Sequence, residues 1–152
     1  MSTTKAFRGF VPARKRGGAY NNEAVTDMIT LTSTGQAQSP SNNIFTGDPV
    51  VLPGANFATI SPFIAGTLKP SGVFMGCQYV ENGEQKFSRY WNGGTSATDI
   101  KFFVITDPSQ TYYIQCSLTL SAAEAAIAKN YTVTVSSTAS SGSTVTGQSS
   151  YY

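Results

Sequence analysis

Acidic side chains are the residues of this 152-residue chain best suited to acid–base chemistry, and there are eight of them. They are scattered along the sequence as Glu23, Asp27, Asp48, Glu81, Glu84, Asp99, Asp107 and Glu124. A glycoside hydrolase needs two carboxylates that flank one bond, and Asp99 with Asp107 is the pair that could converge. However, Asp48 and Asp107 each precede a proline, as turn residues often do, and Glu124 fits a helix capping box. We therefore expect no catalytic residue and no enzymatic activity.

Histidine is absent from the chain, and cysteine occurs only twice. The missing imidazole removes the commonest general base near neutral pH and the commonest transition-metal ligand, which argues against Ser-His or Cys-His catalysis and most zinc sites. Cys77 and Cys116 each lie within a predicted strand and could pair if those strands are neighbours. We expect two buried free thiols instead, because no signal peptide or cysteine framework indicates an oxidising compartment. We also expect no metal and no cofactor.

Glycine-rich and aromatic stretches could bind phosphates or sugars. The glycines at 72–76 and 93–94 lie in or beside predicted strands and are not followed by Lys-Ser/Thr, so they do not form a phosphate-binding loop. Tyr90 and Trp91 could form a platform on which a sugar ring stacks, but aromatic residues near a hairpin end more often lie in the core or at a subunit contact. We predict Phe74, Tyr90 and Trp91 as candidate subunit-interface residues.

Basic charge is concentrated at the N-terminus. Residues 1–16 hold five of the ten Lys and Arg residues and no Asp or Glu, a charge of +5; the remainder holds five basic and eight acidic residues, a charge of −3, which gives the net +2. Such a segment, with phenylalanines among its cations, is typical of an arm that orders on a partner. The contact residues that we predict are Phe7, Arg8, Phe10, Arg14, Lys15 and Arg16.

Two other interpretations of this arm, which we place at residues 1–22, remain open. A basic terminus can be a solvated tail without a partner. Its charge also suffices for weak, salt-sensitive attraction to nucleic acid, but the chain has no recognised groove-reading motif, so we expect no specific nucleic-acid binding. No apolar run in the sequence reaches the length of a membrane span, and we expect no membrane contact.

The elements that must position these residues centre on a β-hairpin over residues 72–95. The first strand alternates between an apolar and a mixed face, as a half-buried strand requires, with Val73, Met75, Cys77 and Tyr79 on the apolar face. Asn82-Gly83 supplies the two positive-φ positions of a type I′ turn, and residues 86–91 resume the alternation. We predict this hairpin as the centre of the fold.

Further elements are predicted on both sides of the hairpin. We expect strands at residues 25–32, 50–52, 57–64, 100–106, 111–118 and 131–135, and one helix at 121–129. Residues 100–106 are apolar on both faces apart from Lys101, which indicates a central strand. The turn at 107–110 predicts that this strand pairs with 111–118 as a second hairpin. Pro62 confines its strand to an edge or a bend, and a short strand could form around Val145.

Together these elements predict a mainly β fold, a compact β-sandwich or small open β-barrel with one short helix and an extended N-terminal arm. The predicted parts are the arm at 1–22, a β domain at 23–136 and a Ser/Thr/Gly-rich C-terminal tail at 137–152. Charged residues make up only 12 % of the chain, about half the usual share. That balance is typical of a β-rich protein that sits against another surface.

The block GVFMGCQYVENGEQKFSRYWNGGTSATD at residues 72–99, followed by an aromatic strand, Asp107-Pro108 and YYIQCS, resembles a known group of proteins. It is similar to a family of small virion proteins from tailed phages of aquatic bacteria, in which a GVF.GC.Y…G…FS.YW.GGT block recurs. The likeness is to capsid decoration, or cement, proteins and covers roughly residues 45–117. Its motif residues look structural, so the resemblance concerns fold and setting rather than a reactive site.

The resemblance implies a structural virion protein that binds the major capsid protein on the outside of the phage head and stabilises the lattice. It also implies a homotrimer that is assembled in the host cytoplasm and located on the capsid surface. The low charge density, polar β surface and basic arm fit a module whose stability is completed by its neighbours. The alternative is another virion component, such as a head-fibre base, tail or adsorption protein, in which Trp91 or the polar tail binds host glycan.

Overall fold

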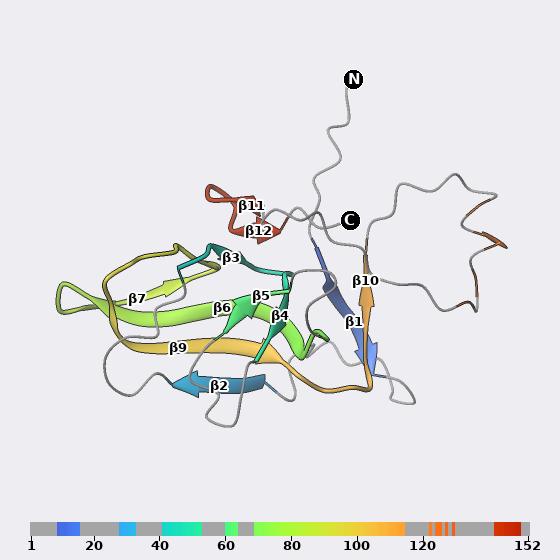
Figure 1. Cartoon of the computed structure of the whole chain (residues 1–152), viewed down its shortest axis with the longest axis horizontal. Coiled ribbons are helices and arrows are strands. Elements are labelled where there is room, and N and C mark those ends of the chain that lie inside the picture. The colour runs from blue at the N-terminus through green and yellow to red at the C-terminus, as the bar shows by residue number, and fades with distance from the viewer. Residues whose placement is uncertain are drawn as a thin grey trace, which may run out of the picture.

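The computed structural model of the chain describes residues 9–15, 28–32, 41–52, 60–63, 69–114 and 142–149, together with residues 122, 124, 125, 127 and 129. Within these residues the fold is mainly β, as predicted, and is built from open sheets. One six-stranded sheet forms the body, and three two-stranded sheets lie around it (Figure 1). The predicted strand at 131–135 and Cys116 lie outside the described residues.

The six-stranded sheet is antiparallel and has the order β2-β9-β6-β4-β5, with β7 also paired to β6. Its strands are β2 (Met28–Thr32), β4 (Pro49–Val51), β5 (Ser61–Pro62), β6 (Gly72–Glu81), β7 (Glu84–Ser88) and β9 (Thr98–Ile105). Because β9 lies between β2 and β6, the predicted central position of residues 100–106 is confirmed. Pro62 lies on β5 at the end of this order, where its missing N–H is tolerated, so its edge position is confirmed as well.

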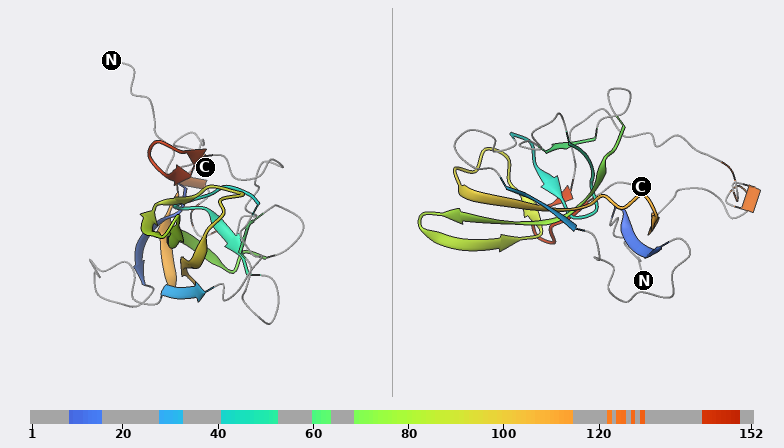
Figure 2. Two further views of the ribbon diagram at one scale, coloured as in Figure 1. Left: turned by 90° about the vertical axis from the view of Figure 1, so that its left-hand side faces the viewer. Right: turned by 90° about the horizontal axis from the view of Figure 1, so that it is seen from below.

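The predicted hairpin is formed by β6 and β7. Asn82 has φ 54° and Gly83 has φ 81°, the two left-handed conformations that a type I′ turn requires. Glu81 and Glu84 face each other across this turn as the last paired residues. Figure 2 shows the hairpin extending away from the side of the molecule that carries β1 and β10.

The predicted alternation along β6 is interrupted by a β-bulge. Phe74 pairs with Val104 and Gly76 with Phe103, so that Met75 is the extra residue of the bulge. The bulge reverses the faces of the strand, which places Phe74 in the core together with Cys77, three positions later. The prediction of a single apolar face through Met75 is therefore wrong, because it assumed an unbroken period of two.

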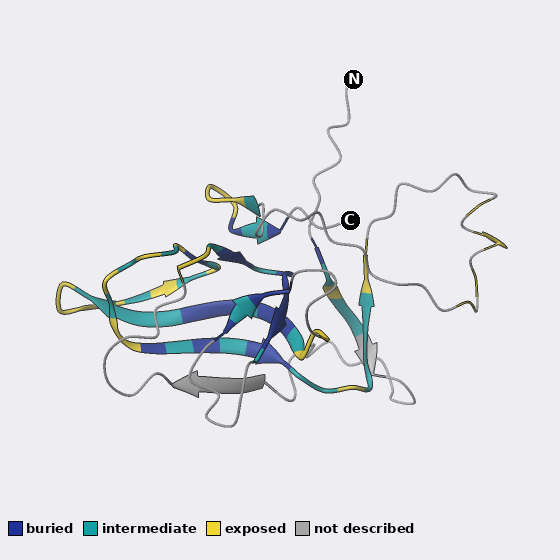
Figure 3. Ribbon diagram, in the orientation of Figure 1, coloured by how far each residue is buried: buried dark blue, intermediate teal, exposed yellow. Residues whose placement is uncertain are grey.

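The core is one cluster between the main sheet and β3 (Ile44–Phe45) with β8 (Tyr90–Trp91). It contains Ile44, Val50, Ile60, Phe74, Cys77, Trp91, Ile100, Phe102 and Val104. Trp91 is held by pairing of β8 with β3, and its ring makes edge-to-face contacts at 5.4 Å with both Tyr79 and Phe102. Figure 3 shows buried positions throughout β4, in the first half of β6 and toward the end of β9.

The predicted second hairpin is wrong. The turn does form, since Gln110 N donates to Asp107 O at 3.1 Å and Asp107 Oδ1 accepts from Ser109 N at 2.8 Å. However, β10 (Gln110–Tyr113) pairs with β1 (Val11–Lys15) rather than with β9. The reason is that β2 and β6 already occupy both edges of β9, so β10 has no edge of that strand to join.

The C-terminal region 137–152, predicted as a tail, contributes a small hairpin to the folded body. Its strands are β11 (Gly142–Ser143) and β12 (Gln148–Ser149), and Gln148 forms a parallel bridge with Thr46. Val145 is 93 % exposed in the connecting turn, so the strand predicted around it is misplaced. In the predicted helix, the described residues 122, 124 and 125 are helical.

Candidate partner-binding surface

Part of the predicted arm is a strand of the molecule itself. Residues 11–15 form β1, and just before it the amide of Phe10 donates to Gly47 O at 2.9 Å. The Phe10 ring packs edge-to-face on Tyr112 at 5.9 Å. The prediction that the whole of 1–22 orders only on a partner is therefore wrong for residues 9–15, because β10 offers them an edge to pair with.

The six predicted contact residues fall into two groups. Phe10, Arg14 and Lys15 are on the folded part of the arm, where Arg14 pairs with Thr111 and Lys15 with Gln110 across the sheet. Phe7, Arg8 and Arg16 lie outside the described residues. The two strands β1 and β10 are named the ribbon below, and they bring the beginning of the chain to the turn that follows β9 (Figure 1).

The outer face of the ribbon carries an exposed apolar pair. Val11 and Tyr113 are directly opposite each other in the register and are 38 % and 69 % exposed. Ile114, which follows β10, is also exposed. Neighbouring apolar side chains left in water are a mark of surfaces that contact another molecule. The sequence reasoning missed this face, because Tyr113, which pairs with Val11, is about a hundred residues away along the chain.

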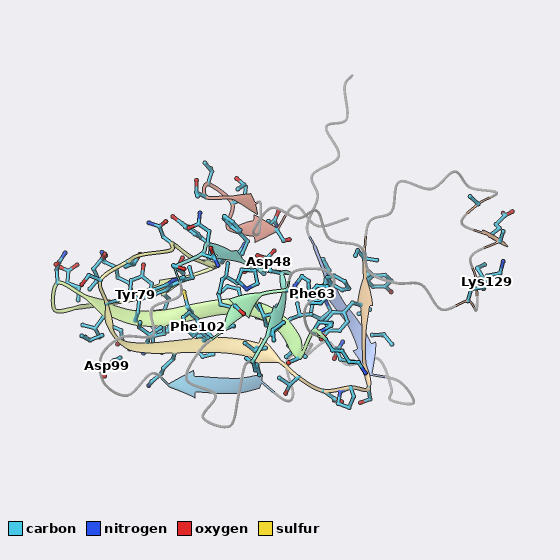
Figure 4. The ribbon with its side chains drawn as sticks, in the orientation of Figure 1. Asp48, Phe63, Tyr79, Asp99, Phe102 and Lys129 are labelled. Atoms are coloured by element: carbon cyan, nitrogen blue, oxygen red, sulfur yellow. The ribbon has the colours of Figure 1, made fainter. Side chains whose placement is uncertain are left out.

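The inner side of the ribbon borders a pocket of about 310 Å³, which is at the small end of the range for ligand pockets. Its lining residues are mostly apolar: Phe10, Pro49, Phe63, Pro70, Ser71, Gly72, Val73, Ile105, Thr106, Asp107, Pro108, Gln110 and Tyr112. Figure 4 places Phe63 beside the ribbon. Burial, with a smaller effect of the Asp107 charge, raises the pKa of Tyr112 from 10.0 to about 12, so its hydroxyl stays neutral even in mildly alkaline solution. The pocket suits uncharged, apolar groups.

The predicted subunit-interface residues do not share one surface. Phe74 and Trp91 are fully buried in the core and cannot contact another subunit, so the prediction is wrong for both. Their burial reflects the bulge at Met75 and the pairing of β8 with β3. Tyr90 is half-buried, stacks on Phe45 at 5.7 Å, and stays a candidate. The burial of Trp91 also rules out its use as a sugar-stacking platform.

The two carboxylates considered for glycoside hydrolysis do not converge. Asp99 is near the start of β9, whereas Asp107 follows its end. The six residue steps from Asp99 to Ile105 alone span about 20 Å of extended strand, well beyond the separation of a glycosidase pair. Figure 4 shows Asp99 on the side of the sheet away from the ribbon. Among the described residues, no group of three or more Cys, Asp or Glu side chains is placed to hold a metal ion.

Cys77 is a buried free thiol, as predicted for this residue. Its sulfur lies 3.5 Å from Tyr90 O and 3.7 Å from Ser88 O, as a weak S–H donor. Burial raises the pKa of Cys77 to about 12, because the low-dielectric core disfavours the thiolate. The thiol is therefore a packing group and not a nucleophile.

Comparison with known proteins found no family model, no curated protein and no solved structure that matches the chain. In the part of the chain that the structure describes, no helix is long and apolar enough to cross a membrane. The outer face of the ribbon, with its exposed Val11 and Tyr113, is the described surface best suited to bind a partner.

Proposed function

We propose that this protein is a structural virion protein that decorates the head of a tailed phage. It binds the major capsid protein on the outer surface of the shell and stabilises the lattice there. The observation that carries the proposal is the outer face of the ribbon, where Val11 and Tyr113 lie opposite each other in water. The resemblance of residues 72–99 to cement proteins gives the setting.

The chemistry of this surface fits an acidic protein partner. An apolar centre is provided by Val11 and Tyr113, and Arg14 and Lys15 continue along the same strand toward Arg16. Protein interfaces commonly combine a buried apolar centre with a charged rim, and the rim charges speed encounter with a surface of opposite sign. On an acidic shell surface, the cations would guide docking and the apolar pair would hold the docked state.

A homotrimer would present three ribbons to the lattice. Each ribbon offers few apolar side chains, and full burial of one such residue contributes about 1.5–3 kcal/mol. Linking three such contacts raises the overall affinity without any new interaction, provided that the geometry allows simultaneous binding. Tyr90 remains the candidate for the subunit contact, and sedimentation of the free protein at micromolar concentration tests this part of the proposal separately.

The experiment that tests the function is a titration of shells stripped of this protein. Wild type is compared with Val11→Ser/Tyr113→Ser, and with Phe87→Ser as the matched control, since Phe87 on β7 is as exposed as Tyr113, at 71 %. We expect the double variant to dissociate about tenfold faster or more, because apolar burial is lost, and the control to bind as wild type does. Circular dichroism checks that each variant is folded.

Two results would contradict the proposal at different levels. If wild type does not bind stripped shells at all, the decoration function is wrong. If the ribbon variant and wild type bind equally, the function stands but the contact lies elsewhere on the molecule. Weaker binding of Phe87→Ser alone would move the contact to the β6–β7 hairpin.

A further inference from the structure

Two segments from opposite ends of the sequence meet on one four-residue turn, Phe45–Asp48. The carbonyl of Gly47 accepts a hydrogen bond from Phe10 N at 2.9 Å, and the carbonyl of Thr46 accepts one from Ser149 N at 3.0 Å. The amide of Thr46 in turn donates to Gly147 O at 3.0 Å. Consecutive peptide groups of one turn therefore hold the beginning and the end of the described chain.

The two segments also touch each other directly. Gly9 is buried in the left-handed conformation, with φ 65°, and a Cβ atom on it would lie 2.7 Å from Cβ of Ser149 and 2.6 Å from Gly47 O. Ser149 is itself buried. Each segment thus covers the other, so lifting either one would open packed surface and hydrogen-bonded groups of its neighbour to water.

The C-terminal hairpin is fitted closely to the body through two further glycines. A Cβ atom on Gly142 would collide with the ring of Phe45, and one on Gly147, with φ 69°, would lie 2.6 Å from Cβ of Arg89. Such close backbone approach needs glycine, and it shows that residues 142–149 pack in a defined position against Phe45 and Arg89.

The strand β1 depends on its contact with the C-terminal hairpin more than a strand of a large sheet would. Among the described strands it pairs only with β10, in a two-stranded ribbon, and an isolated two-stranded ribbon is marginally stable in water. The anchor at Gly9 and Phe10 precedes β1 directly and ties it to the body. Holding this anchor in place therefore holds the ribbon together.

We propose that the β11–β12 hairpin is a latch that locks β1 onto the body. The two ends of the described chain dock cooperatively on the Phe45–Asp48 turn, and opening of one releases the other. The ribbon and the Phe10 wall of the pocket are then complete only while the latch is closed. This property belongs to the free protein and does not depend on any shell, so it can fail or hold independently of the decoration function.

Amide hydrogen exchange of the full chain tests the latch. Gly147→Val disturbs the hairpin through its contact with Arg89, and Gly9→Val disturbs the anchor of β1. The matched control is Gly94→Val, since Gly94 has the same left-handed backbone, with φ 79°, and nothing within 4 Å of an added Cβ. We expect Gly147→Val to speed exchange at residues 10–15 by about tenfold or more, and Gly9→Val to do the same at 142–149.

Three results separate cooperation from its alternatives. Under the proposal, β6 and β9 keep wild-type exchange in both single variants, and the double variant exchanges no faster at either end than the faster single variant. If Gly147→Val speeds exchange only within residues 142–149 and leaves the exchange of residues 10–15 unchanged, the proposed latch is wrong. Loss of protection throughout β6 and β9 would also overturn it, because the ends would then not open as a separate unit.

Discussion

Phe45 and Asp48 are joined by two reciprocal hydrogen bonds. The amide of Phe45 donates to Oδ2 of Asp48 at 2.8 Å, and the amide of Asp48 donates to the carbonyl of Phe45 at 2.9 Å. Between them Gly47 has φ 93°, as the third residue of a type II turn requires. Gly47 N and Asp48 O also bond to Phe74 of β6 at 2.8 and 2.9 Å, so this turn connects the core to both terminal segments.

The first prediction concerns the buried carboxylate of this turn. Asp48→Ala should lower the free energy of unfolding by about 1–3 kcal/mol, because the buried Phe45 amide loses its side-chain acceptor. Glu84→Ala removes an exposed carboxylate and should change stability by less than about 0.5 kcal/mol. Urea denaturation measures both. Equal stability of the two variants would mean that the side chain of Asp48 does not hold the turn.

The sequence was sufficient to predict the turns whose conformation depends on only a few neighbouring residues. The type I′ turn at Asn82-Gly83 needs only its own two residues, and so does the turn that Asp107 forms with Ser109. For the same reason, the prediction that Asp48 forms a turn before Pro49 is confirmed.

The failed predictions depend on what lies beside a segment in space. Whether β10 pairs with β9 depends on whether β2 already occupies that edge, which no pattern within residues 100–118 reveals. No partner strand within the chain was predicted for residues 11–15, because β10, which pairs with them, is about a hundred residues away in the sequence. The bulge at Met75 reversed the faces of β6, and it left no periodic signal in the sequence because Phe74 and Met75 are both apolar.

The second prediction uses Trp91, the sole tryptophan of the chain. Because it is enclosed between Tyr79 and Phe102, its fluorescence in the folded protein should resist quenching by acrylamide and should become quenchable in urea. Trp91→Ala should destabilise the protein by about 3–5 kcal/mol, as large aromatic deletions in cores do. Adding soluble sugars should leave the emission unchanged. A sugar-dependent shift would instead support glycan binding at this residue.

The third prediction concerns the thiol of Cys77. Because burial holds its pKa near 12, against 9.0 when exposed, the folded state keeps its proton through the range from 9 to 12. The contribution of this group to stability is therefore complete below pH 9 and is lost as the pH rises toward 12. In a Cys116→Ser variant, alkylation of Cys77 at pH 8.5 should be at least about a hundredfold slower in the folded protein than in the protein unfolded by urea. Equal rates would show that the thiol is accessible.

The fourth prediction separates the cations of the arm from its apolar face. Replacing Arg14, Lys15 and Arg16 with glutamine should chiefly lower the rate of association with shells and make it less sensitive to salt. The dissociation rate should change little. Lys129→Gln, at an exposed position outside the ribbon, is the control for charge alone. A selective increase in the dissociation rate of the triple variant would contradict a purely steering role.

Under the proposed decoration of a phage head, the docking surface is tested most directly by a density map of intact virus particles that contain this protein. Decoration of the head predicts hundreds of copies on the outside of the shell, with Val11 and Tyr113 of each copy against the major capsid protein. The β6–β7 hairpin, on the opposite side of the molecule, should point away from the shell. A few copies at the tail, or a shell contact made by the hairpin while the ribbon faces solvent, would contradict the account.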